Sequence, residues 1–280
     1  MARITTRAWN NYTRTMRRIS DRAEAEMRAM ITKLSAQYEA GNITLEEYEN
    51  ATIDYAYALA QRYGEAAGAL ASEMYDAIAE LQGVSVPPAV PAPTATMAET
   101  AKTVKGTMKT GNPDIVAQAT GRLTKQVGAD TMLQNAKRDG ASFAWKPSGD
   151  TCAYCLTLAG LGWQKAGKLT LKGGHAEHIH ANCDCNYVVD LKGDLKVEGY
   201  DPSEINQRII EMTGGEYNAE DIIKMSGRTS KQKARDNEAL NMMRRKFYAD
   251  NKEVINEQKR SAYAKRKERN SSAAEEIDVS

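Results

Sequence analysis

The chain has 280 residues, 27% of them charged, with a formal net charge of +1, so it can form one large domain or two ordinary ones without bulk affinity for DNA. It contains no apolar run of about twenty residues, which argues against a membrane span. The basic N-terminus also lacks the apolar run of a secretory signal, so we expect a soluble protein in a reducing cytoplasm.

A helical pattern covers the first 83 residues. Between residues 10 and 40, apolar side chains recur every three or four positions, as on one helix face: Met16, Ile19, Ala23, Met27, Met30, Leu34 and Tyr38. Gly41 and Asn42 interrupt the pattern, and Thr44 with Glu47 has the spacing of a capping box. A second apolar set then continues through Leu45, Tyr48, Tyr55, Leu59, Tyr63, Leu70, Met74, Ile78 and Leu81. Residues 1–83 therefore predict an αα-hairpin, whose tyrosine and methionine faces either pack internally or form a groove for a partner.

The middle of the chain combines a proline-rich segment, helices and short strands. Residues 84–96 hold four of the seven prolines and predict an extended, semi-rigid linker. Residues 97–138 predict two helices, with a break at Gly111-Asn112-Pro113. Strands are predicted at 142–145 (SFAW) and 186–191 (NYVVDL).

The last part of the chain, residues 196–280, is expected to be helical and basic, with a disordered acidic end. Residues 228–270 contain 14 Lys and Arg against 6 Asp and Glu. Such a charge run is typical of a solvated helix face or a loosely ordered tail, and contact with nucleic acid is the alternative. The last ten residues are small, polar and acidic, which is typical of disorder.

All four cysteines and all three histidines lie in one window of 34 residues, 152–185. A C-x-x-C spacing points two thiolates at one metal ion, and a later His and Cys set can complete a tetrahedral zinc site. The window therefore predicts a structural Zn²⁺ site, with five donors for four positions. These donors are Cys152, Cys155, His180, Cys183 and Cys185. Zinc would hold together two short strands in a region with few large apolar side chains.

Two other interpretations of this window stay open. A redox or disulfide pair at Cys152 and Cys155 would leave the second cysteine pair and the histidines without a role. A catalytic metal site would use His175 and Glu177 as in zinc deaminases, but those enzymes place their C-x-x-C later in the chain. Five soft donors also tend to fill all four zinc positions, whereas a catalytic zinc keeps one open. A nuclease of the His-Asn-His kind would draw on His178, His180 and Asn182.

The sequences GDTCAYCLTLAGLGW (149–163) and HANCDC (180–185) resemble the minor head proteins of tailed bacteriophages, the phage Mu protein F-like family. That family has the form D-x-C-x-x-C, a variable loop, H-P-x-C-x-C and a strand. This chain matches it over about residues 140–192, with Ala181 where the family usually has proline. The matching positions are Asp150, Cys152, Cys155, His180, Cys183 and Cys185. In this comparison His175 and His178 belong to the variable loop.

The resemblance implies a minor capsid protein for head morphogenesis, located in the virion head after assembly in the host cytoplasm. Its expected partners are the portal protein, the major capsid protein or both, with non-specific contact between the basic segment and packaged DNA and no membrane. We expect no catalytic residue and no cofactor besides structural zinc. The alternative is a zinc-containing nuclease or toxin-like enzyme that acts on nucleic acid.

The expected fold is mainly α, with a small α+β zinc-stabilised module. In chain order we expect a helical docking arm (1–83), a proline-rich linker (84–96), a Mu F-like module with the zinc site (97–195) and a helical, basic C-terminal segment (196–280).

Overall fold

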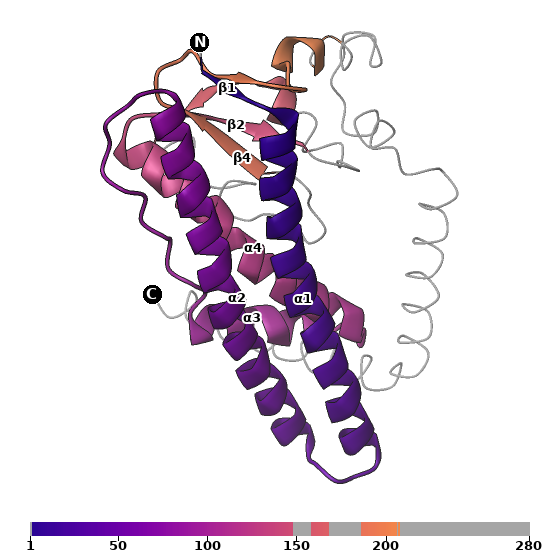
Figure 1. Ribbon diagram of the computed structural model, residues 1–280. Coiled ribbons are helices and arrows are strands. Elements are labelled where there is room, and N and C mark those ends of the chain that lie inside the picture. The colour runs from indigo at the N-terminus through magenta and orange to yellow at the C-terminus, as the bar shows by residue number, and fades with distance from the viewer. Residues whose placement is uncertain (1, 148–157, 168–185, 206, 208–280) are drawn as a thin grey trace, which may run out of the picture. The chain divides into compact units, whose positions relative to one another are not determined.

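The computed structural model describes residues 2–147, 158–167, 186–205 and 207 (Figure 1). The chain divides into two units, Met1–Gly227 and Arg228–Ser280, and every described residue lies in the first. The described part is mainly helical, which confirms the mainly α part of the predicted fold class. None of the helices within these ranges is long and apolar enough to cross a membrane. The predicted basic segment and acidic end lie outside the described residues.

Helices α1 (Thr6–Glu39) and α2 (Leu45–Leu81) form the predicted αα-hairpin. The Thr5 side chain accepts a hydrogen bond from the first turn of α1, and Thr44 with Glu47 forms the predicted capping box of α2. In the connecting turn Gly41 has a φ of +73°, a left-handed conformation that glycine adopts without a Cβ clash. The break and the capping signal are therefore both confirmed.

Helices α3 (Met97–Met108) and α4 (Pro113–Arg138) confirm the predicted pair and its break. A Thr96–Glu99 capping box begins α3, and the Asn112 side chain caps α4 with Pro113 in the first turn. Helix α4 packs against α1, α2 and α3, and it lies behind the hairpin in Figure 1. It is therefore the central helix of the bundle.

The buried face of α2 agrees with the predicted one only in part, since Leu59 and Ile78 of the predicted set are buried. The prediction relied on large apolar side chains, but Leu45 and Leu81, at the two ends of the helix, are 52% and 47% exposed. The buried positions are mostly small residues: Ala56, Ala60, Gly64, Ala67, Gly68, Ala71 and Ala79. Short side chains let α4 approach closely, since a Cβ placed on Gly64 would lie only 3.2 Å from Cγ2 of Val127.

Two small sheets lie at one end of the hairpin (Figure 1). Strands β2 (Ser142–Lys146) and β4 (Asn186–Asp190) correspond to the two predicted strands and pair antiparallel. Strand β3 (Gln164–Lys165) pairs with the other edge of β2, giving the order β3-β2-β4. Near the N-terminus, β1 (Arg3–Ile4) pairs parallel with β5 (Lys196–Val197). Segments from both ends of the described chain therefore meet here.

The end of α2 is tied to the end of β4 by a buried polar network. The Gln82 side chain donates to Asp190 at 2.7 Å and accepts from the backbone N–H of Leu191 at 2.9 Å. The Asp190 carboxylate also accepts from the backbone N–H groups of Lys192, Gly193 and Leu195. Burial alone would raise the pKa of Asp190, but these hydrogen bonds together hold it below its ordinary value. The sheet is thereby fixed to the hairpin.

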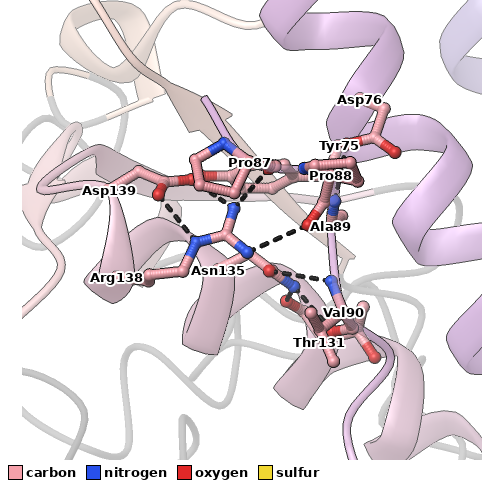
Figure 2. A network of polar contacts seen from close by, with 10 residues as sticks. All are labelled: Tyr75, Asp76, Pro87, Pro88, Ala89, Val90, Thr131, Asn135, Arg138 and Asp139. Atoms are coloured by element: carbon pink, nitrogen blue, oxygen red, sulfur yellow. Dashed lines mark hydrogen bonds and ion pairs between the residues drawn. The ribbon is translucent and has the colours of Figure 1, made fainter. Parts of the chain in front are cut away.

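Residues 84–96 are extended, as predicted, and they run along α2 and α4 (Figure 2). The Asn135 side chain accepts from the backbone N–H of Val90 at 3.0 Å and donates to the Val90 carbonyl at 2.9 Å. The Arg138 guanidinium donates to the carbonyls of Pro87 and Pro88 and forms two hydrogen bonds with Asp139. This segment therefore joins α2 to α3 while being held by specific contacts along its length.

Candidate functional site

The five predicted zinc ligands, Cys152, Cys155, His180, Cys183 and Cys185, all lie outside the described residues. The same holds for Asp150, His175 and His178. What the structure does describe is the framework to which these segments are attached.

The two Cys/His segments are attached to the same end of one strand pair. The first begins just beyond Pro147, which follows the last residue of β2, and the second ends at Cys185, directly before the first residue of β4. Lys146 and Asn186 are register partners, so their Cα atoms lie about 4.5–5.5 Å apart. The chain thus leaves and re-enters the described sheet at neighbouring points (Figure 1), an arrangement that is compatible with a metal site shared by the two segments.

The chain between the two segments is also fixed to this sheet. Residues 158–167 return to β2, where Ser142 pairs with Lys165 of β3. The Tyr200 hydroxyl donates to the Ala159 carbonyl at 3.0 Å, and its ring meets the Trp163 ring edge-on at 6.4 Å. Both ends of each Cys/His segment are therefore anchored to described, packed structure.

Lys146 is a buried cation at the same end of the strand pair, and it is only 6% exposed. Its ammonium donates to the Gly199 carbonyl at 3.3 Å and lies 5.6 Å from the Trp9 ring centroid and 5.9 Å from that of Tyr200. Within the described ranges it forms no ion pair with a carboxylate, and burial lowers its pKa. Sequence analysis missed this residue because a lysine that ends a short strand gives no local signal of burial.

Within the described residues, no three His, Cys, Asp or Glu side chains lie close enough together to hold a metal ion. All cysteines and histidines of the chain lie outside the described residues. The zinc site in the Cys/His window stays a prediction, and the structure describes the strands from which the window extends.

Comparison with known proteins gives one family. Searches of curated proteins and of solved structures found no match. The model of the VG15 protein family matches residues 3–211, which include the whole hairpin, α3, α4, the sheets and the Cys/His window. Because this match spans well over half of the chain, the chain belongs to the VG15 protein family, a family of viral gene 15 proteins.

Proposed function

We propose that this chain is a bacteriophage minor capsid protein, a structural component of the virion head that acts in head morphogenesis. The observation that carries the proposal is the viral family match, which covers the helical bundle and the Cys/His window together. The resemblance of that window to Mu protein F-like head proteins supports the finer assignment to the head.

The first part of the proposal is a structural Zn²⁺ site formed by four of the five donors Cys152, Cys155, His180, Cys183 and Cys185. The pairing of Lys146 with Asn186 supports it, because the two halves of the donor set start from neighbouring points. When bound, zinc supplies a cross-link between the two segments and no reaction step. The proposal therefore assigns no catalytic residue.

The second part is a docking role for the αα-hairpin toward the portal protein or the major capsid protein. The end of the hairpin that carries the turn extends past α3 and α4 (Figure 1). There the rings of Tyr38 and Tyr48 stack with centroids 5.6 Å apart, and Tyr38 and Leu45 are 42% and 52% exposed. Exposed aromatic and aliphatic side chains at a projecting end are suited to anchor a protein interface. We call Tyr38, Leu45 and Tyr48 the hairpin tip.

The zinc site is tested by metal analysis of the purified full chain. We expect about one zinc per chain, bound by thiolates. Replacing Cys152 by Ser should lower both the zinc content and the midpoint of thermal unfolding, because the metal cross-link is part of the fold. The His178→Ala variant is the matched control, since we place His178 in the loop, and it should keep its zinc.

A chain that contains no zinc and has four freely titratable thiols would refute the zinc site. A Cys152–Cys155 disulfide in the protein from a reducing cytoplasm would instead favour the redox interpretation. A metal-dependent DNA cleavage that is lost in His180→Ala, with unfolding unchanged, would favour the nuclease.

A further inference from the structure

The N-terminal half of α1 carries four exposed arginines in one stripe: Arg7, Arg14, Arg18 and Arg22. At 100° per residue these positions fall within an arc of about 80°, and they extend over about 22 Å of the helix. The buried residues of the same half, among them Trp9, Met16 and Ala23, lie on the opposite side of the helix. The stripe, which we call the arginine stripe, therefore faces away from the bundle.

The four arginines differ from Arg17 and Arg28 in forming no ion pair with a carboxylate of the described residues. Arg17 pairs with Asp21, and Arg28 pairs with Asp114 at 2.6 Å. For Arg7, Arg14, Arg18 and Arg22 we find no ion pair or side-chain hydrogen bond within the described part of the chain. The Glu26 carboxylate acts on Arg22, and four guanidinium groups on one line still make a strong local positive potential on a chain whose net charge is only +1.

The surroundings of the stripe favour a polyanion over a protein as partner. The large apolar side chains that are exposed in the described residues are Tyr38, Leu45, Leu81, Val90, Met97 and Leu161, and none of them lies in residues 6–32. A stable protein interface needs a desolvated apolar centre, which this face does not offer. Phosphate binding needs charge and hydrogen-bond donors, and exposed Asn10 and Asn11 add neutral donors on the same side of the helix.

We propose that the arginine stripe binds the phosphate backbone of duplex DNA without reading its sequence. Guanidinium groups donate two parallel hydrogen bonds to phosphate, and each contact releases a counterion from the DNA. The four arginines of the stripe belong to helix α1, and none of them is part of the basic segment 228–270 of the sequence. The arginine stripe contains none of the proposed zinc donors and no residue of the hairpin tip. An experiment on DNA binding therefore tests this proposal independently of the zinc site and of the docking role.

The test is the salt dependence of binding between the purified full chain and a random-sequence DNA duplex. We expect that changing all four stripe arginines to Gln reduces the slope of log K against log salt by about 3 to 4, since each lost phosphate contact removes about one. At a fixed low salt concentration, binding should weaken by at least about tenfold. The residual slope then belongs to the rest of the chain.

A matched control removes the same charge from other faces of the bundle. Its four exposed positions are Lys102, Lys105, Lys109 and Lys137, all changed to Gln. This control should keep the wild-type slope, and an Arg→Lys version of the stripe should retain most of the binding because its charge is unchanged. All variants should unfold at the wild-type temperature, since the eight positions are exposed.

Equal losses in the stripe and control variants would overturn the proposal, because bulk charge would then explain binding. An unchanged slope in the stripe variant would also overturn it. If that variant instead binds DNA normally but dissociates a self-associated form of the chain, the stripe binds an acidic face of a second copy.

Discussion

The Asn135 side chain forms hydrogen bonds with the backbone of the proline-rich segment, as a neighbouring β-strand would do in a sheet. It is 3% exposed, and its side-chain amide both accepts from and donates to the backbone of Val90, while also donating to the Thr131 carbonyl at 2.7 Å (Figure 2). Beside it, the Arg138 guanidinium, followed by the Tyr75 hydroxyl, holds the pKa of Asp139 below its usual range. Buried polar groups of this kind are costly to leave unpaired.

We therefore expect Asn135→Ala to lower the free energy of unfolding by about 2–3 kcal/mol, because it leaves the N–H and carbonyl of Val90 without their partner. Urea denaturation followed by circular dichroism measures this difference. Gln134→Ala, the adjacent exposed position of α4, is the control and should change stability by less than about 0.5 kcal/mol. Similar values for the two variants would show that the amide does not hold the segment.

Asp130 of α4 makes stability depend on pH. Burial raises its pKa to about 6, which a hydrogen bond from Gln126 offsets only in part. Between the ordinary pKa of 3.8 and this value the folded state binds more protons than the unfolded state, so the free energy of unfolding falls as the pH rises through this window. The contribution is complete below the ordinary pKa and is lost above about 6.

Replacing Asp130 by Asn should consequently stabilise the protein at pH 7.5 by about 1–2 kcal/mol, because a neutral amide avoids the cost of burying charge. Near pH 4, where the carboxyl is already protonated in the folded state, the same substitution should change little. Thermal unfolding at both pH values checks this, and an equal shift at both would contradict the assignment.

At the scale of elements, the close approach of α2, α4 and the proline-rich segment depends on helical glycines. A Cβ on Gly64 would lie 2.9 Å from Cγ2 of Thr94. Thr94 cannot easily move away, because its hydroxyl donates to Gln61 at 2.6 Å and Gln61 donates to the Ala95 carbonyl at 2.7 Å. The packing at this position therefore requires the absence of a side chain.

Gly64→Ala should then destabilise the protein by about 1–2 kcal/mol, although alanine is the better helix former by about 1 kcal/mol. Gly106 in α3 is the matched control, because nothing lies within 4 Å of a Cβ placed there. Gly106→Ala should be neutral or stabilising by up to about 1 kcal/mol. Opposite signs in the two unfolding curves are the expected result, and two stabilising substitutions would contradict the close packing.

Local signals in the sequence were sufficient to predict the four helices and strands β2 and β4, but not the two-residue strands β1, β3 and β5. The Thr44–Glu47 capping box and the Asn112-Pro113 start act within one helical turn, and so they can be recognised without the fold. The small-residue face of α2 could not be predicted, because it follows from where α4 packs. The burial of Lys146 and the contacts of the proline-rich segment likewise depend on residues distant in sequence.

The sequence predicts a group of candidate zinc donors, but it does not predict where the segments that contain them attach to the fold. The spacing of the cysteines and histidines identified the window, whereas the strand register at Lys146 and Asn186 shows that its two halves attach side by side. Register depends on pairing between segments about 40 residues apart, and short strands give little sequence information about it.

At the scale of the whole molecule, one hydrophobic cluster joins the hairpin to the sheet that carries the Cys/His segments. It contains Trp9 and Met16 of α1, Tyr75 of α2 and Phe143 and Tyr187 of the sheet. A change in the sheet therefore affects the packing of the hairpin base. The hairpin tip lies at the other end of α1 and α2, so variants can test the proposed docking and the proposed zinc binding separately.

This separation allows a clean test of docking. Changing Tyr38 and Leu45 of the hairpin tip together to Ser should leave the zinc content unchanged and reduce incorporation into particles by at least about tenfold, because we propose that the tip supplies the interface anchors. The double variant Leu161→Ser with Val90→Ser, which removes exposed apolar side chains elsewhere, is the control and should be incorporated normally.

The most direct measurement for the central claim is quantitative mass spectrometry of purified virions of the phage that encodes this chain. The proposal that it is a minor head protein predicts the chain in the particle, in a fixed and low ratio to the portal protein. Its absence from mature virions and from assembling heads, despite expression in the infected cell, would contradict the proposal.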